Sequence, residues 1–261
     1  ADWLVLRDPG GTTRDSVAWR VAPRGIPIEH RRPGGVTTAA GEISAQAGAR
    51  ATVAPPSSPR ELVVHVLDVG QGDAILIQNG GSTVLVDGGP DRRALARWLD
   101  VLHVPDTIDA VILTHVHGDH FEGLRELFSS RRRTTVRELW WNGDAAPNFS
   151  FTGLPDTLAA RARARTTIVR DTDDPCGDGR AVCTIVLKGG AKLHLLRPMP
   201  DALDENDRSA AIKVVGPDSA SFTMWLAGDA EQNEIRWFQT AAGYTRSPGM
   251  HADVLKANHH G

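Results

Sequence analysis

Apolar and polar residues alternate along residues 62–261 in a pattern that predicts strands interleaved with helices. Short runs rich in β-branched residues predict strands at both ends of residues 64–77, at 83–89 and at 109–114. Helical spacing predicts helices at residues 92–102, 121–128 and 230–240. This alternation, with its antiparallel hairpins, predicts an α/β (α+β) fold, arranged as a four-layer αβ/βα sandwich.

The N-terminal segment, residues 1–53, has a different pattern. Short apolar stretches separated by Pro-Gly and Arg-Gly turns predict a few short strands in a small β module. Residues 54–61 are rich in Pro and Ser, which is typical of a linker before the main domain at 62–261. The N-terminal segment is either a barrel-like binding module or an arm that packs on the main domain.

Composition narrows the class of protein. A chain of 261 residues with 41% apolar content can bury one large core, or one large and one small core. No apolar run approaches the length of about 18 residues that a membrane span needs, so the sequence predicts a soluble chain. The net charge of −3 gives no general attraction to nucleic acid.

Two arginine clusters could still contact a phosphate backbone. One is the run at residues 131–133 and the other consists of Arg161, Arg163 and Arg165. The competing interpretation is a solvated helix end, where cations also interact favourably with the helix dipole.

The two cysteines, Cys176 and Cys183, leave two alternatives open. Their separation suits a hairpin closed by a disulfide, which would indicate an oxidising compartment; otherwise both are free thiols. The numbered chain starts at Ala1 rather than Met, which is compatible with removal of a signal peptide. We therefore expect an extracytoplasmic location, in the periplasm or at the cell exterior.

Residues 114–120 read Thr-His-Val-His-Gly-Asp-His, directly after a predicted strand. His115 and His117 lie two residues apart in extended chain, so both rings project to one side. Asp119 is predicted to cap the helix over 121–128, which brings Asp119 and His120 back toward the same point. Imidazoles with a neighbouring carboxylate suit Zn or Mn, so this segment predicts a metal site.

Four further segments carry a family resemblance. They are residues 64–77 with Asp-Val-Gly-Gln-Gly-Asp, 206–209 with Asn-Asp-Arg-Ser, 225–231 with Gly-Asp, and 252–261 with His-His-Gly. In this order they resemble the metallo-β-lactamase superfamily, and more narrowly the soluble hydrolase domain of the ComEC-type competence proteins. Those proteins are bacterial and membrane-integral, so the resemblance implies a bacterial source and a membrane channel as partner.

The resemblance implies two divalent metal ions, Zn or Mn, held by six ligands drawn from seven candidate residues. In chain order the ligands are His115, His117, Asp119, His120, Asp229, and one of His259 and His260. His115 and His117 would bind the first ion, Asp119 and His120 the second, and Asp229 would bridge them. Asp87 would lie behind the loop and orient a ligating imidazole through a hydrogen bond.

The region before the Gly-Asp segment departs from the superfamily pattern. Many members place a third histidine there, whereas this chain has Asn206 and Ser209. The nearest histidine, His194, lies in an alternating run and is predicted to be a strand residue. We expect Asn206 and Ser209 to bind substrate, with Lys213 or Arg208 adding charge. Two residues of the Gly-rich turn, Gln71 and Asp73, are also predicted to line the pocket.

Two adjacent metal ions favour hydrolysis, because they lower the pKa of a shared water and neutralise charge in the transition state. Asp119 and Asp229 are the predicted catalytic residues, which bind metal and orient the water. The resemblance implies a phosphodiesterase, or nuclease, acting on DNA. Two alternatives remain: hydrolysis of a small phosphodiester such as a phosphocholine ester, and a non-catalytic, metal-stabilised DNA-binding module.

Overall fold

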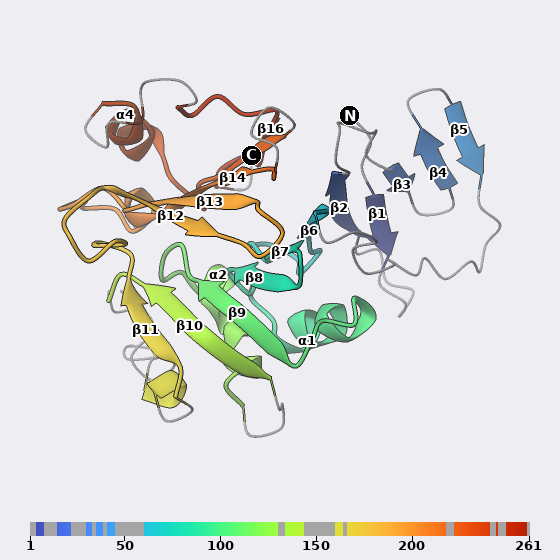
Figure 1. Ribbon diagram of the computed structural model, residues 1–261, viewed down its shortest axis with the longest axis horizontal. Coiled ribbons are helices and arrows are strands. Elements are labelled where there is room, and N and C mark those ends of the chain that lie inside the picture. Colours follow the sequence, from blue (N-terminus) through green and yellow to red (C-terminus); the bar gives the residue numbers. More distant parts are fainter. Residues whose placement is uncertain are drawn as a thin grey trace.

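The computed structural model contains two large β-sheets and a small third one (Figure 1). It describes residues 60–129, 134–143, 160–163, 166–217, 222–240, 244 and 249–259, together with the backbone of five strands nearer the N-terminus. Within this described part, no helix is both long enough and apolar enough to cross a membrane.

The first sheet has eight strands in the order β1-β2-β6-β7-β8-β9-β10-β11. The strands are β1 Leu4–Arg7, β2 Asp15–Val21, β6 Leu62–Val66, β7 Ile75–Asn79, β8 Ser82–Val86, β9 Thr107–Ile112, β10 Thr135–Trp141 and β11 Ile168–Asp171. Neighbours from β1 to β8 pair antiparallel, and neighbours from β8 to β11 pair parallel. Parallel strands need a crossover, and α1 (Arg92–Val101) supplies it between β8 and β9.

The second sheet has five strands in the order β12-β13-β14-β15-β16. They are β12 Val182–Val186, β13 Lys192–Leu196, β14 Ala211–Val215, β15 Thr223–Leu226 and β16 Val254–Leu255. Only the last pair, β15 and β16, is parallel within this sheet. The small third sheet consists of β3 His30–Arg32, β4 Gly35–Thr38 and β5 Gly41–Ser44.

Three apolar cores show how the layers stack, and they confirm the predicted four-layer fold. One core lies between the two sheets and includes Val84, Ile112, Ile212 and Leu226. A second joins the first sheet to α1 through residues such as Leu85 and Leu95. The third joins the second sheet to α4 (Gln232–Thr240) through Trp225 and Phe238. In Figure 1, α4 and α1 accordingly cover the outer faces of the two sheets.

The segment predicted as a helix over residues 121–128 is helical as far as Glu126, but it does not form one α-helix capped by Asp119. The α-helix α2 spans Gly118–Phe121 with His117 as its cap, and a 3-10 helix η1 follows over Glu122–Glu126. Gly123 lies against the turn after β8, where its N–H donates to Gly89 O (2.8 Å) and a Cβ would meet Gly88 O at 1.8 Å. The backbone is therefore drawn to that turn instead of continuing an α-helix.

Strands β1 and β2 continue the first sheet, because β2 pairs antiparallel with β6. Their side chains, and residues 45–59, lie outside the described residues. The division into a module at 1–53, a linker at 54–61 and a domain at 62–261 therefore stays a prediction.

Cys176 and Cys183 form a disulfide, which confirms the first of the two alternatives for these cysteines. The bond closes the loop that leads into β12. Trp140 and Trp141, in β10, are both buried and pack into different cores on the two faces of the first sheet. They belong to the interior and not to a substrate groove.

Candidate metal centre

The histidine loop after β9 is fixed by one buried carboxylate. Asp87 follows β8, is 0% exposed, and accepts hydrogen bonds from the Thr114 backbone N–H (2.8 Å) and hydroxyl (2.7 Å). The same carboxylate lies 2.8 Å from His120 Nδ1. Asp87 thus holds both ends of the loop that carries the histidines. Its φ of 56° is unusual for a residue other than glycine, a conformation that surrounding contacts must stabilise.

The Gly-rich turn between β6 and β7 packs directly on this loop. Gly72 has a φ of +118°, and a Cβ there would lie 2.0 Å from the backbone oxygen of Asp119. Only glycine adopts this conformation readily and leaves room for the neighbouring backbone. The Asp-Val-Gly-Gln-Gly-Asp segment is therefore needed for the shape of the histidine loop.

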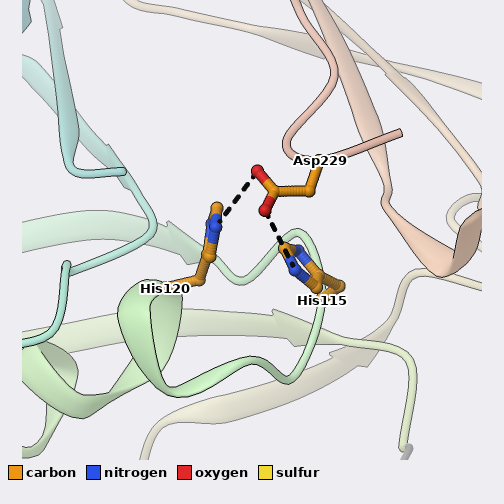
Figure 2. Close-up of side chains that lie close together, drawn as sticks. All are labelled: His115, His120 and Asp229. Carbon is orange, nitrogen blue, oxygen red and sulfur yellow. Dashed lines mark ion pairs between the residues drawn. The ribbon is translucent and has the colours of Figure 1, made fainter. Parts of the chain in front are cut away.

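Three buried side chains from opposite sheets converge at the edge of the sandwich (Figure 2). His115 and His120 come from the loop after β9, and Asp229 follows β15. Asp229 Oδ1 lies 3.2 Å from His120 Nε2, and Asp229 Oδ2 lies 3.9 Å from His115 Nε2. One carboxylate thus faces two imidazoles, one through each oxygen. His117 lies beside them, with its Nδ1 at 3.1 Å from His115 Nε2.

These distances fit a shared cation. Zinc binds imidazole nitrogen at about 2.0–2.1 Å, so two ligand atoms on a tetrahedral ion lie roughly 3.3 Å apart. The donor atoms of His115, His120 and Asp229 all lie within 4.8 Å of one another. His120 Nε2 is buried and, apart from its contact with Asp229 Oδ1, makes no hydrogen bond within the described residues. Neutral imidazole nitrogens and a carboxylate are suitable donors for zinc or manganese.

The electrostatics of the group also favour a positive charge at its centre. Burial lowers the pKa of His120, but the charge of Asp87 and hydrogen bonds to Asp229 and Asp87 outweigh burial and raise that pKa to about 10. Burial and the neighbouring His120 hold the pKa of His115 well below its usual range. Burial alone would raise the pKa of Asp229, yet its hydrogen bond and ion pair with His120 lower it strongly. A metal ion would take the place of the His120 proton.

Not every predicted ligand joins this group. Asp119 is half-buried, and its carboxylate is not among the three converging donors of the described residues. His259 is exposed, and its Nδ1 lies 3.0 Å from Glu231 Oε1. His260 lies outside the described residues. The roles of these residues and of His117 as ligands therefore stay predictions.

The predicted substrate residues have structural contacts of their own. Asn206 belongs to the short 3-10 helix η2 (Asn206–Arg208), and its amide donates to Glu231 Oε1 (3.2 Å). Ser209 is fully buried, and its hydroxyl accepts the backbone N–H of Asp229 (3.2 Å), so it fixes the carboxylate that faces the histidines. Gln71 is exposed on the Gly-rich turn, whereas Asp73 is buried and paired with Lys256.

Lys213 and Arg208, the two residues expected to add positive charge for substrate binding, have protein partners of their own. Lys213, in β14, is buried and donates to Gly249 O and His251 O, both at 2.6 Å. Arg208 pairs with Asp173 at 3.0 Å. His194 is a strand residue of β13, as predicted.

Sequence reasoning did not single out Lys256 or Glu231. Each lies within three residues of a predicted ligand, and this proximity is the signal that could have identified them.

A family model of the metallo-β-lactamase superfamily matches residues 67–138 of this chain. Among curated proteins, microtubule-associated protein 1A of Rattus norvegicus is 37% identical over 67 residues, which cover 26% of this chain and 2% of that protein. Microtubule-associated protein 1S of Rattus norvegicus is 39% identical over 74 residues, covering 28% and 7%. The matched segment is thus a small part of either relative.

Several solved structures are similar to this chain. The metallo-β-lactamase of Cronobacter sakazakii with a HARLDQ motif has a TM-score of 0.46 and 17% identity, and the match covers 75% of this chain and 74% of that one. GOB-18 of Elizabethkingia meningoseptica has a TM-score of 0.47 and 14% identity over 75% and 73%. The short form of human tRNase Z has a TM-score of 0.42 and 16% identity over 72% and 71%. All three TM-scores lie below 0.5.

Proposed function

We propose that this chain, whose residues 67–138 match the metallo-β-lactamase superfamily model, is a dinuclear metal-dependent hydrolase that cleaves phosphodiester bonds in DNA. The observation that carries this proposal is the convergence of His115, His120 and Asp229, all buried, at one edge of the sandwich. Burial of polar side chains costs free energy unless a partner compensates it. Three buried polar side chains that face the same point are typical of a site that binds a cation.

The residues of the chain have distinct tasks in the proposed reaction. When bound, the metal ions would lower the pKa of an attacking water and neutralise charge on the phosphoryl oxygens. His115 and His120 present ring nitrogens to the centre, while Asp87 fixes the orientation of the His120 ring. Asp229 lies between the imidazoles and is held by Ser209. Asp119 and Asp229 would orient the water as well as bind metal.

Two features support DNA and an extracytoplasmic location. The segments at residues 64–77 and 252–261 resemble those of the ComEC-type domain, which is associated with DNA uptake. The Cys176–Cys183 disulfide is typical of an oxidising compartment, such as the periplasm or cell exterior. A bacterial protein that acts there on incoming DNA would work beside a membrane channel. Because the net charge is −3, DNA contacts would be local, for example through the exposed Arg161 and Arg163.

Two other functions are kept as alternatives. The same centre would hydrolyse a smaller phosphodiester, such as a phosphocholine ester, if no groove admits DNA. A non-catalytic module is supported by a different observation: curated relatives that match about a quarter of this chain are named as microtubule-associated proteins. Sequence similarity over the segment therefore does not by itself indicate catalysis.

A cleavage assay separates these functions. Metal-stripped protein is given Mn²⁺ or Zn²⁺ and then linear or circular DNA, single- or double-stranded, with a phosphocholine ester assayed in parallel. We expect metal-dependent cleavage of DNA. Turnover of the small ester alone would move the assignment to that substrate class.

The Asp119→Ala variant distinguishes an enzyme from a non-catalytic module. If the wild type cleaves and the variant retains fold and DNA binding but loses cleavage, the enzyme assignment stands. Unchanged cleavage by the variant would remove Asp119 from the mechanism. DNA binding without cleavage by the metal-loaded wild type would favour the non-catalytic module.

A further inference from the structure

The ammonium group of Lys256, in the segment that follows β16, lies beside the candidate metal centre. It follows β16, and its ammonium is ion-paired with Asp73 of the Gly-rich turn, a residue 183 positions earlier in the chain. Both side chains are largely buried, with 14% of the Lys256 side chain and 10% of the Asp73 side chain exposed. A lysine in such a setting has a fixed position, in contrast to a solvated surface lysine.

The second contact of Lys256 brings it next to Asp229. Its Nζ donates to the backbone oxygen of Gly228, the residue before Asp229, at 3.2 Å. Its positive charge is one of the interactions that lower the pKa of Asp229, after those of His120 and His115. An ammonium has three N–H donors, and Asp73 and Gly228 accept two of them. Among the described residues no third acceptor lies within hydrogen-bond distance of Lys256 Nζ, so the remaining donor can meet an oxygen that enters the centre.

Asp73 also links Lys256 to the loop behind the metal centre. Ligand atoms of Asp73, Asp87 and His120 lie within 4.8 Å of one another. Burial raises the pKa of Asp73, and the charge of Lys256 opposes this shift. A phosphate oxygen arriving beside this group would meet buried carboxylates, which repel it, unless a cation compensates them. Lys256 is placed to compensate, whereas Arg208 and Lys213 are engaged with Asp173 and with backbone carbonyls.

We infer that Lys256 is a further substrate-binding residue, whose ammonium, positioned by Asp73 and the Gly228 carbonyl, binds an anionic oxygen of a phosphodiester at the metal centre. This inference rests on the proposed function, and it assigns the anionic phosphoryl group as the feature that is recognised. It differs from a metal-ligand role, because the ammonium has no lone pair to donate. Asp73 is then a positioning residue for Lys256.

The test measures binding of inorganic phosphate by calorimetry to the full, Mn²⁺-loaded chain. The variants are Lys256→Gln, Lys256→Arg, and the double variant Asp73→Asn with Lys256→Gln. Lys188→Gln is the matched control, since Lys188 lies in the turn between β12 and β13 and has 56% of its side chain exposed. Mn²⁺ affinity and melting temperature are recorded for each, so that loss of metal or of fold is recognised.

We expect Lys256→Gln to weaken phosphate binding by about tenfold to a hundredfold, as loss of a charge-assisted hydrogen bond does, with Mn²⁺ affinity retained. Lys256→Arg keeps the charge and should retain more affinity, and Lys188→Gln should match the wild type. The double variant restores neutrality of the buried pair but not the cation, so its phosphate binding should remain weak. For a hydrolysed phosphodiester, KM should rise more than kcat falls.

Three results would overturn the inference: unchanged phosphate affinity in Lys256→Gln, recovery of affinity in the double variant, or absence of phosphate binding by the wild type. Recovery would show that Lys256 merely neutralises Asp73. Failure of the proposed function would look different. If phosphate binds in a Lys256-dependent manner but no phosphodiester is cleaved, the anion site stands and the hydrolase assignment falls.

Discussion

The two sides of the candidate metal centre are held in different ways. On one side, His115, His120 and Asp229 are each at most 1% exposed and follow β9 and β15. On the other side, His259 is exposed, has a positive φ of 45° and contacts the equally exposed Glu231. The first side takes its geometry from the packed core, whereas the second depends on a small number of side-chain hydrogen bonds and ion pairs.

The difference arises from where each segment sits in its sheet. β9 lies between β8 and β10 in the first sheet, so its end is fixed by neighbours on both sides. β16 is a two-residue strand at the edge of the second sheet. It is attached through Lys213, which holds Gly249 and His251, and through Asp253, which accepts hydrogen bonds from Thr223. A few such contacts allow more local opening than a buried strand does.

The largest effect is expected from Asp229→Asn on the buried side. The amide removes one anionic oxygen between the two imidazoles, so metal-dependent hydrolysis should fall by more than about a hundredfold, beyond the loss typical of an outer hydrogen-bond partner. Steady-state rates with saturating Mn²⁺ measure this. Asp178→Asn is the control, because Asp178 is an exposed carboxylate whose partner among the described residues is Arg180. Equal rates in both variants would contradict a central role for Asp229.

The glycine turn gives a test of how tightly the buried side is packed. Gly70 and Gly72 both have positive φ, but only at Gly72 does a Cβ meet a neighbour, the Asp119 backbone at 2.0 Å. Gly70→Ala should cost about 1–2 kcal/mol of unfolding free energy from strain alone. Gly72→Ala should cost about 3 kcal/mol or more, because the histidine loop must move as well. Urea unfolding measures both; similar values would mean that the loop is not tightly packed.

A smaller effect is expected for Asp87→Asn, which keeps shape but removes charge behind His120. Outer carboxylate partners of ligating histidines typically contribute 10–100-fold to metal affinity, so the Zn²⁺ dissociation constant should rise by about that factor. Competition with a chelating indicator measures it. Asp109→Asn, a partly exposed carboxylate that accepts the Thr83 N–H, is a suitable comparison with no expected change. An unaltered constant in Asp87→Asn would separate Asp87 from metal binding.

The pH dependence of stability should report a buried carboxyl near the centre. Glu234 is fully buried, and burial raises its pKa to about 9 against the hydrogen bonds from the Met199 and Ser209 backbones. The native state then binds a proton that the unfolded state releases above its ordinary pKa of about 4.5. Stability should therefore fall as pH rises from about 5 to 9, by at most about 1.4 kcal/mol per pH unit.

The Glu234→Gln variant isolates this contribution, because glutamine does not titrate. Its stability should change less with pH than that of the wild type over the same window, whatever its absolute stability. Denaturant unfolding at several pH values gives both slopes. Parallel slopes would show that Glu234 is ionised in the native protein.

The smallest effect on stability is expected from His259→Ala on the exposed side. The ion pair of His259 with Glu231 is exposed and contributes little, so the unfolding free energy should stay within about 0.5 kcal/mol of the wild type. Metal stoichiometry is the sharper measurement, since loss of one bound ion would assign His259 as a ligand. His251→Ala, also exposed and without a predicted ligand role, is the matched variant. Unchanged stoichiometry would direct attention to His260.

The sequence by itself determined most of the elements and the local part of the site. The strands around residues 62–86 and 107–112, and the helices at 92–101 and 232–240, follow from periodicity and β-branched content. The spacing of His115, Asp119 and His120 on one loop is also local, because the chain itself limits how far these residues can separate. The helix predicted over 121–128 failed because a glycine contact with the turn after β8 changed its hydrogen bonding.

Only the tertiary structure decided which distant groups meet. The packing of the two sheets on one core placed Asp229 opposite His115 and His120, more than a hundred positions away. It also placed Lys256 against Asp73 and turned Lys213 inward to backbone carbonyls. Residue type gave no means to rank Lys213, Arg208 and Lys256, since the role of each follows from its burial and from the acceptors around it. Such contacts depend on the relative position of whole layers, which no local pattern specifies.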